Sequence, residues 1–406
     1  ANVDKCIECG FCEVNCLTCG FSLSSRQRIV IQREISRLKK LSDTESSERL
    51  KTLQKQYKYL GNATCAGDGL CSMSCPMGIN VGDLTHDIRQ ANLPEKSIGY
   101  KTGDFVANHF AETKSALRPV LYLANMAHNM LGDKVMSSIG QGLHQIGVPL
   151  WTPSMPKPYY PHRIQQHEES LKVIYFPSCI NQTMGTAKDS PDQTPLIDKT
   201  VALLQKAGYE VIFPENMKNL CCGTIWESKG MMDTADRKSE AALYKASNGG
   251  KYPVLCDQSP CLHRMRKVMT QVKLYEPVEF IYTFLKDKLV FSPIDEPIAV
   301  HITCSMRKMN LGNMLVDLAR LCSTKVIVPE EVGCCGFAGD RGFTYPEVNA
   351  YALRKLKPQI EKAGVKTGYS NSRTCEIGLT TNAGIPYISI VYLVDKCTTS
   401  KNKCHE

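Results

Sequence analysis

Hydrophobic residues in the first part of the chain recur with the period of a helix. In residues 26–41, isoleucine and leucine stand mostly three or four positions apart, which places them on one helical face. Residues 43–60 repeat the pattern, with Asp43 in an N-cap position and Gly61 as the predicted stop. Residues 151–162 contain four prolines, so they cannot continue a helix and predict an extended linker. Residues 1–165 are therefore predicted to form a helical domain.

The rest of the chain alternates short apolar runs with helical patterns, and it does so twice. The first series of runs lies at 173–176, 211–214 and 253–256, and the second at 299–303, 326–329 and 368–371. This alternation is typical of βαβ units with a parallel sheet. The predicted fold is α+β and multidomain: a helical domain at 1–165, then two repeated α/β modules at 166–292 and 293–406.

Cysteine content changes the picture more than any other feature of composition. The chain has 20 cysteines in 406 residues. Disulfide frameworks belong to small secreted domains, and residues 1–20 show no apolar signal segment, so intracellular metal binding is the prediction. Because the motifs begin at Cys6, we expect either a small subunit or a piece of a longer polypeptide.

Charge and hydropathy limit the location and the partners. No uncharged apolar stretch reaches 18 residues, so no transmembrane helix is expected. The formal net charge of +9 suits an anionic membrane surface or an acidic partner. Few aromatic residues accompany the basic ones, which argues against nucleic acid. We expect a cytoplasmic protein, with peripheral contact at the inner face of the cell membrane left open.

The first cysteine run has the spacing of bacterial ferredoxins. Cys6, Cys9, Cys12 and Cys16 are separated by two, two and three residues, although Leu17 replaces the usual proline after the run. Such a run wraps a [4Fe–4S] cluster, and in two-cluster proteins its fourth cysteine binds the other cluster. Four cysteines also suit tetrahedral zinc, but this spacing favours iron and sulfur.

A second run follows, and it lacks one cysteine. It consists of Cys65, Cys71 and Cys75, and Asp68 stands in the middle position. The crossed assignment gives the first cluster Cys6, Cys9, Cys12 and Cys75, and the second cluster Cys16, Cys65 and Cys71. Three alternatives remain for its fourth position: Asp68 binds through oxygen, Cys19 supplies sulfur, or the cluster is a [3Fe–4S] type. A carboxylate is a hard ligand for a soft site, which favours Cys19 or an open corner.

Each α/β module carries a Cys-Cys-Gly motif with further cysteines just past predicted strands. The candidate ligands are Cys179, Cys221, Cys222, Cys256 and Cys261 in the first copy, and Cys304, Cys334, Cys335 and Cys375 in the second. Open α/β sheets bind ligands at the carboxyl ends of their strands, which is where these cysteines are expected to lie. A further cluster or a zinc ion is therefore predicted, foremost in the first copy. In the second copy the last cysteine is missing, and Gly378 stands near its place.

Other residues add less to the prediction. Buried structural cysteine is the alternative for both Cys-Cys-Gly sets. His301, within a predicted strand, is expected to be a core histidine. Cys322, Cys397 and Cys404 are expected to be structural or exposed.

These motifs together resemble the iron–sulfur half of bacterial FAD-linked D-2-hydroxyacid dehydrogenases, foremost D-lactate dehydrogenases. The resemblance rests on the segments that begin at Cys6, Thr64, Cys256, Cys334 and Ser370, and it spans nearly the whole chain. The Cys-Cys-Gly modules are also similar to those of glycolate oxidase, anaerobic glycerol-3-phosphate dehydrogenase and heterodisulfide reductase subunits.

The resemblance implies an electron-transfer function without a catalytic residue in this chain. An FAD-binding dehydrogenase domain or subunit would oxidise the hydroxy acid, and electrons would pass through the clusters to a quinone or cytochrome. Two other hypotheses stand beside it. One is a thiol/disulfide redox enzyme similar to heterodisulfide reductase, acting at the first Cys-Cys-Gly set. The other is a zinc-stabilised binding module without redox chemistry.

Overall fold

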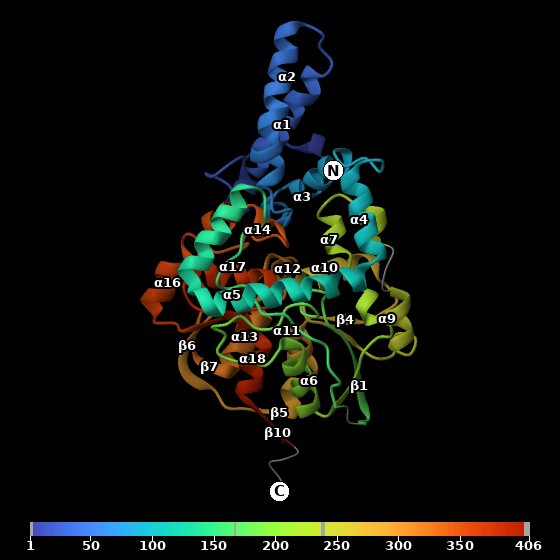
Figure 1. Ribbon diagram of the computed structural model, residues 1–406, viewed down its shortest axis with the longest axis vertical. Helices are drawn as coiled ribbons and strands as arrows, with labels where there is room; N and C mark the ends of the chain where they lie inside the picture. The colour runs from blue at the N-terminus through green and yellow to red at the C-terminus, as the bar shows by residue number, and fades with distance from the viewer. Residues whose placement is uncertain (1–2, 166–167, 237–239, 402–406) are drawn as a thin grey trace.

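The computed structural model describes residues 3–165, 168–236 and 240–401 (Figure 1). A helical N-terminal region is followed by two α/β modules with parallel sheets, as the sequence predicts. Figure 1 shows α1 and α2 projecting from one end of the molecule, with both modules at the other. Cys404 lies outside the described residues.

The N-terminal region is built from five helices and short helical turns. They are η1 (Val3–Lys5), η2 (Phe11–Asn15), α1 (Ser25–Leu38), α2 (Thr44–Tyr57), η3 (Lys58–Ala63), η4 (Leu70–Ser74), α3 (Val81–Ala91), α4 (Ile98–Asn108) and α5 (Phe110–Gln145). Asp43 caps α2 as predicted, because its side chain accepts a hydrogen bond from the Ser46 amide.

The predicted helix stop at Gly61 is wrong. The chain continues from α2 into a single π-helical turn, η3, and leaves it only after Ala63. A Cβ at Gly61 would lie 2.5 Å from the Tyr57 ring, so glycine at this position allows the ring to pack against the turn. Glycine is required here because the Tyr57 ring lies against this residue, and not because the helix ends.

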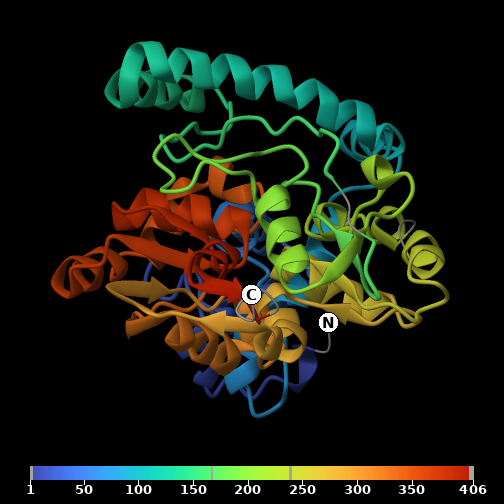
Figure 2. The same cartoon turned by 90° about the horizontal axis from the view of Figure 1, so that it is seen from below.

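Helix α5 lies along the outside of the molecule, and the segment that follows it separates it from the modules (Figure 2). The helix breaks at Gly132, where φ is 74° and ψ is 174°. Among the described helices, none is both long and apolar enough to cross a membrane. The proline-rich segment 151–162 does not continue the helix, as predicted, but it packs on the modules: the Ser154 hydroxyl donates to the Ile377 carbonyl.

The two modules repeat one sheet topology. The first sheet has the order β2-β1-β3-β4, and the second has the equivalent order β7-β6-β8-β9, with every pairing parallel. The strands are β1 (Leu171–Phe176), β2 (Tyr209–Ile212), β3 (Val254–Cys256), β4 (Leu274–Tyr275), β6 (Ile294–Val300), β7 (Ser323–Ile327), β8 (Thr367–Ser370) and β9 (Tyr387–Ser389). The internal repeat in the sequence therefore corresponds to a repeat in structure.

Helices connect these strands, and one small antiparallel pair, β5 (Leu289–Phe291) with β10 (Thr398–Ser400), joins the last described strand to the segment between the two modules. The first module has α6 (Leu196–Lys206), η5 (Met217–Asn219), α7 (Thr224–Glu227), α8 (Met232–Asp236), α9 (Glu240–Ala246), α10 (Ser259–Val268), α11 (Pro277–Phe280), η6 (Ile281–Leu285) and η7 (Lys286–Lys288). The second has α12 (Cys304–Lys308), α13 (Gly312–Cys322), α14 (Arg341–Thr344), α15 (Pro346–Ala352), α16 (Leu356–Ala363), α17 (Arg373–Ala383) and α18 (Ile390–Lys396).

The two modules share a hydrophobic core. Val173 and Leu203 of the first module belong to the same buried cluster as Ile298 and Leu393 of the second. Helix α18 packs on α6, and at the edge of this contact Asp395 pairs with Lys199 and Lys206. Because each module uses the other to bury apolar surface, we expect the pair to unfold as one unit.

Replacing Leu393 by alanine tests this coupling. The side chain is fully buried in the shared core, so Leu393→Ala should lower the free energy of unfolding by about 2–5 kcal/mol. In a Trp151→Phe background, Trp226 of the first module is the remaining tryptophan, and its fluorescence should report the loss in urea unfolding.

The matched control is Val328→Ala, at a side chain that is 38% exposed, which should change stability by less than about 0.5 kcal/mol. An unchanged Trp226 midpoint in Leu393→Ala would show that the modules unfold independently.

Candidate metal centres

The two ferredoxin-type runs fold in the same local way. Gly10 and Gly69 adopt left-handed conformations, with φ of 84° and 71°, and each begins a 3-10 turn. Cys16 and Cys75 end these turns in extended conformations. The two turns, η2 and η4, pack against each other, and Asn15 donates a hydrogen bond to Ser74 across the contact. Paired loops of this kind allow the last cysteine of each run to reach the first cysteines of the other run.

Four cysteines of the crossed assignment line one small cavity. They are Cys6, Cys9, Cys12 and Cys75. Ile29, Ile79 and Val81 form an apolar wall beside them. Burial raises the pKa of Cys12, and the hydrogen bond from Ser25 partly opposes this. The donor set is sulfur only, which suits a soft cluster site.

The three cysteines assigned to the second cluster also lie together. The pKa of the buried Cys71 thiol is raised to about 12, chiefly by burial, with a contribution from the negative charges of Asp68, Cys65 and Cys16. Cys19 is exposed and lies beside Cys16. Its carbonyl accepts a hydrogen bond from the Tyr351 hydroxyl, which ties this loop to the second module.

Three arginines surround the second set and supply positive charge. Arg28 is 1% exposed, and its Nη1 lies 3.7 Å from the Cys16 sulfur. Arg89 donates to the Cys65 carbonyl at 2.8 Å, and Arg341 from the second module donates to the Ala63 carbonyl. Burial lowers the pKa of Arg89 to about 10 and also lowers that of Arg341, and in both cases the charge of Cys65 acts in the opposite direction.

Asp68 lies close both to Cys71 of the second set and to Cys334 of the second module. Its Oδ1 accepts the Leu70 amide at 3.1 Å, whereas Oδ2 is sealed from solvent and has no hydrogen-bond partner. Burial raises the pKa of this carboxyl, and the nearby Cys334 thiol and Lys308 ammonium lower it. The carboxyl thus lies against the Cys-Cys-Gly set of the second module.

The five cysteines of the first Cys-Cys-Gly set converge. Their thiols form a chain of contacts in the order Cys179, Cys221, Cys222, Cys261 and Cys256. Hydrogen bonds from Cys221, Cys261 and Thr224 hold the pKa of Cys222 well below its usual range. The Gly223 amide lies 3.4 Å from the Cys221 sulfur and donates to it. All five predicted residues therefore meet at the carboxyl ends of the strands.

The third residue of the motif must be glycine for a geometric reason. Gly223 has a φ of 87°, and a Cβ there would lie 2.2 Å from the Ala235 carbonyl oxygen. Its equivalent, Gly336, has a φ of 74° and faces Ala352 and Val348 at 3.0 Å. The turn that follows each cysteine pair therefore excludes any side chain.

Lys114 was not among the residues singled out from the sequence. It stands on α5, is 4% exposed, and its Nζ donates to the Gln182 amide oxygen at 2.8 Å. Burial lowers the pKa of Lys114 to about 8, and the charges of Cys179 and Cys221 oppose this. A buried ammonium is costly without an anion. In sequence it is 65 residues from the nearest of these cysteines, so no local pattern could reveal it.

The four cysteines of the second set also converge. The Cys335 and Cys375 sulfurs lie 3.2 Å apart, and Cys334 contacts both Cys304 and Cys335. The amides of Gly336 and Phe337 donate to the sulfurs of Cys334 and Cys335. A cation again stands nearby: burial lowers the pKa of Arg307, and the charges of Cys304 and Cys334 oppose this shift.

The predicted place of the missing cysteine, Gly378, is wrong. Strand β3 ends at Cys256 and strand β8 ends at Ser370, each three residues before the next helix. Cys261 and Cys375 then occupy the same position in α10 and α17. The missing cysteine therefore corresponds to Ser370. A Cβ at Gly378 would lie 2.6 Å from the Asn349 amide, so no cysteine would fit there.

The remaining candidate residues, His301, Cys322 and Cys397, lie in the protein core. His301 is buried, which lowers its pKa to about 4, and its two ring nitrogens contact Ser370 and the Gly333 carbonyl. It is thus the satisfied core histidine that was expected. Cys322 and Cys397 are buried against each other at the ends of α13 and α18, away from both sets.

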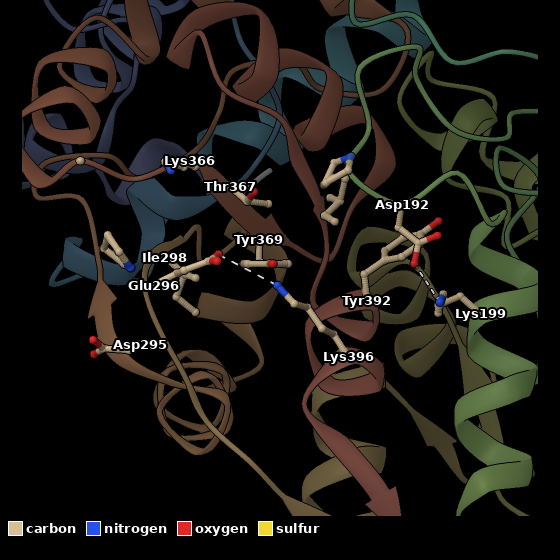
Figure 3. A pocket seen from close by; sticks show the side chains of 14 residues that line it. Asp192, Lys199, Asp295, Glu296, Ile298, Lys366, Thr367, Tyr369, Tyr392 and Lys396 are labelled. Atoms are coloured by element: carbon tan, nitrogen blue, oxygen red, sulfur yellow. Dashed lines mark ion pairs between the residues drawn. The ribbon is translucent and has the colours of Figure 1, made fainter.

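Another cavity lies away from the cysteines. It has a volume of about 450 Å³ and sits at the opposite ends of the strands, where Glu296, Thr367 and Tyr369 line it (Figure 3). Among its lining residues, Asp192 forms an ion pair with Lys199, and Glu296 forms one with Lys396 (Figure 3). None of its lining residues is a cysteine. Within the described ranges, no group of three His, Cys, Asp or Glu side chains is arranged to hold a single metal ion.

The donor chemistry fits thiolate-bound iron–sulfur clusters. Each set offers sulfur ligands, and amides donate to sulfur in both Cys-Cys-Gly turns. A buried or half-buried cation accompanies the second N-terminal set and both Cys-Cys-Gly sets: Arg28, Lys114 and Arg307. Clusters of this kind carry net negative charge, and nearby charges and hydrogen bonds to sulfur set their potentials.

Family comparisons agree with this division of the chain. Residues 2–79 match the 4Fe-4S dicluster domain, and residues 173–266 and 298–380 match the Cysteine-rich domain. The chain is therefore an iron–sulfur protein in which a dicluster domain precedes two cysteine-rich domains.

Among curated proteins, this chain is similar to Lactate utilization protein A of Bacillus subtilis (strain 168). The two are 24% identical over 214 residues, which cover 48% of this chain and 85% of that protein. The protein of the same name from Halalkalibacterium halodurans is 27% identical over 187 residues, 41% of this chain and 73% of that protein. Picrophilus torridus aspartate racemase aligns with a TM-score of 0.27 and 10% identity, over 58% of this chain and 97% of that one, which supports no statement about fold or function.

Substitution of Gly223 by alanine should disrupt the first Cys-Cys-Gly turn. The new Cβ would meet the Ala235 carbonyl in a left-handed backbone, so we expect a loss of about 3 kcal/mol or more in urea unfolding. Gly208→Ala is the matched control, because its φ of 77° is similar but its Cβ would meet nothing within 4 Å. It should cost about 1 kcal/mol. Equal losses in the two variants would refute the steric explanation.

Replacing Arg341 by glutamine tests the role of buried positive charge. A unit charge about 8 Å from a cluster changes the electrostatic free energy of an added electron by about 2 kcal/mol at an effective dielectric constant of ~20. Allowing for partial exposure, the reduction potential of the second N-terminal cluster should fall by on the order of 50 mV in an EPR-monitored titration. Arg341→Lys keeps the charge and should stay within about 20 mV of the parent. If both variants shift equally, geometry rather than charge is responsible.

Proposed function

We propose that this chain is the electron-transfer portion of a flavin-dependent dehydrogenase that oxidises lactate or a related D-2-hydroxy acid. The observation that carries the proposal is the arrangement of four cysteine sets in one molecule, with neighbouring sets in contact through protein side chains. The similarity to Lactate utilization protein A supports lactate as the substrate class of the whole system.

The proposed ligands are the cysteines predicted from the sequence. Cys6, Cys9, Cys12 and Cys75 would hold one [4Fe–4S] cluster. Cys16, Cys65 and Cys71 would hold a second cluster, with Cys19 as a fourth ligand or a [3Fe–4S] type without one. Each Cys-Cys-Gly set would hold a further iron–sulfur centre.

The contacts between the sets support a continuous route for electrons. The first and second N-terminal sets adjoin, because the paired turns η2 and η4 end in Cys16 and Cys75. The loop of the second set reaches the second module, where Lys308 donates to the Asp68 carbonyl at 2.9 Å. Helix α10, which carries Cys261, packs on α12, which begins at Cys304. Electrons would thus move through the N-terminal clusters into the second module and on to the first.

Bound clusters would supply single-electron transfer, and the residues of this chain have the supporting tasks. Apolar side chains such as Ile29 and Val81 keep water from the first cavity. Arg28, Lys114 and Arg307 stabilise the negative charge that accumulates on reduction. The chain would receive electrons from FAD on a partner domain or subunit and pass them to a quinone or cytochrome. Contact with the inner face of the cell membrane is part of this proposal.

Anaerobic purification followed by mixing with a flavin partner tests the function. Iron and acid-labile sulfide should be present, and D-lactate should bleach the cluster absorbance. Cys6→Ser should lower the iron content and the extent of bleaching, because it removes a ligand of the first cluster. Cys397→Ser is the matched control outside the four sets, and it should leave both unchanged.

Other outcomes would favour the competing hypotheses. Iron and sulfide without bleaching by any 2-hydroxy acid would contradict the dehydrogenase assignment. Reduction of disulfides by this chain alone, given an electron donor, would indicate an enzyme similar to heterodisulfide reductase. Zinc without iron after anaerobic handling would indicate a binding module.

A further inference from the structure

We infer that Asp68 of the N-terminal domain is a ligand of the iron centre in the second α/β module, and not of the second N-terminal cluster. The inference rests on the proposed function, because it takes Cys304, Cys334, Cys335 and Cys375 as ligands of an iron-containing centre. The ligand it adds is a carboxylate from a different domain.

The position of the carboxyl group is the first argument. Oδ1 is held by the Leu70 amide at 3.1 Å, so the side chain is fixed in direction. Oδ2 is sealed from solvent without a hydrogen-bond partner. The group lies close to the thiols of Cys334 and Cys304, and also to that of Cys71 in the second N-terminal set. A sealed carboxylate oxygen without a partner is costly, and a metal ion would remove that cost.

The domain interface holds Asp68 in this place. Lys308, at the end of α12, donates to the Asp68 backbone carbonyl at 2.9 Å. The turn η4 packs on α12, and a Cβ built on Gly333 would lie 3.9 Å from the Leu70 side chain. The contacts on both sides of Asp68 therefore join the ferredoxin-type loop to the residues that flank Cys304 and Cys334.

The ligand count is the second argument. The first module brings five cysteines together, whereas the second brings four, because Ser370 replaces the equivalent of Cys256. The Ser370 hydroxyl does not replace the lost sulfur, since it is engaged with His301. Asp68 restores the number of donors to five. Iron accepts oxygen as well as sulfur ligands, so a mixed donor set is chemically sound.

The consequence is that one short loop would bind two centres. Cys65 and Cys71 serve the second N-terminal cluster, and Asp68 between them serves the second module. Such a loop would fix the two centres relative to each other and provide a short covalent path between them. It would also make the second module, rather than the first, the point at which electrons leave the N-terminal domain.

The experiment compares spectra of variants purified anaerobically as the full chain. Asp68→Asn keeps the shape of the side chain but removes its charge. It should lose or alter the same EPR and Mössbauer features that Cys304→Ser loses, and keep those that Cys65→Ser loses. Asp83→Asn is the matched control, at an exposed carboxylate on α3. It should keep every feature of the parent and its full iron content.

Each result decides the inference. Loss of the features that depend on Cys65 would assign Asp68 to the second N-terminal cluster and overturn it. A spectrum identical to that of the parent would show that Asp68 is no ligand. If Asp68→Asn fails to fold, Asp68→Cys should restore iron with altered g-values of the same centre; no such change would also overturn the inference. A parent protein without iron would instead refute the proposed function as a whole, whereas iron unaffected by Cys304→Ser would refute an iron centre in the second module and, with it, the role of Asp68.

Discussion

The structure depends above all on compensating the negative charge of buried sulfur. Thiolates and the clusters they bind cannot lie in a dry interior without positive charge nearby. The molecule places Lys114 beside Cys179 and Cys221, Arg307 beside Cys304 and Cys334, and Arg28 beside Cys16. Backbone amides in the Cys-Cys-Gly turns add further donors to sulfur. Because Lys114 comes from the N-terminal domain and its cysteines from the first module, charge compensation also links these two domains.

The second constraint is the topology of the repeated module. Parallel strands end at one edge of each sheet, so cysteines that follow different strands meet there without any contact between them in sequence. The glycine of each motif, at a φ near 80°, lets the chain turn back beneath the cysteine pair. The two sheets then share one hydrophobic core, which fixes the two sulfur-rich edges relative to each other. The electron-transfer proposal follows from this fixed arrangement, since single-electron steps require short and constant distances.

Much of the site could be predicted from sequence, because its strongest signals are local. The spacing of Cys6, Cys9 and Cys12 is typical of a tight loop around a cluster, and it can be read from seven residues. The Cys-Cys-Gly pairs were also recognised with their partners, since each follows an apolar run. The predictions that failed depended on packing. Gly61 signals a helix stop, but its role is to admit the Tyr57 ring. Gly378 is near the expected spacing, but strand register places the missing cysteine at Ser370.

The sequence alone therefore determined the class of chemistry, the helical N-terminal region and the repeat of two parallel α/β modules, because residue type, periodicity and short spacing carry that information. Only the tertiary structure decided which charges face which sulfurs. Lys114 and Arg341 reach their cysteines across long sequence separations, and Asp68 lies close to Cys334 as well as to Cys71 of its own run. These placements result from the burial of helices and loops against other domains, and no local pattern specifies how such surfaces pack.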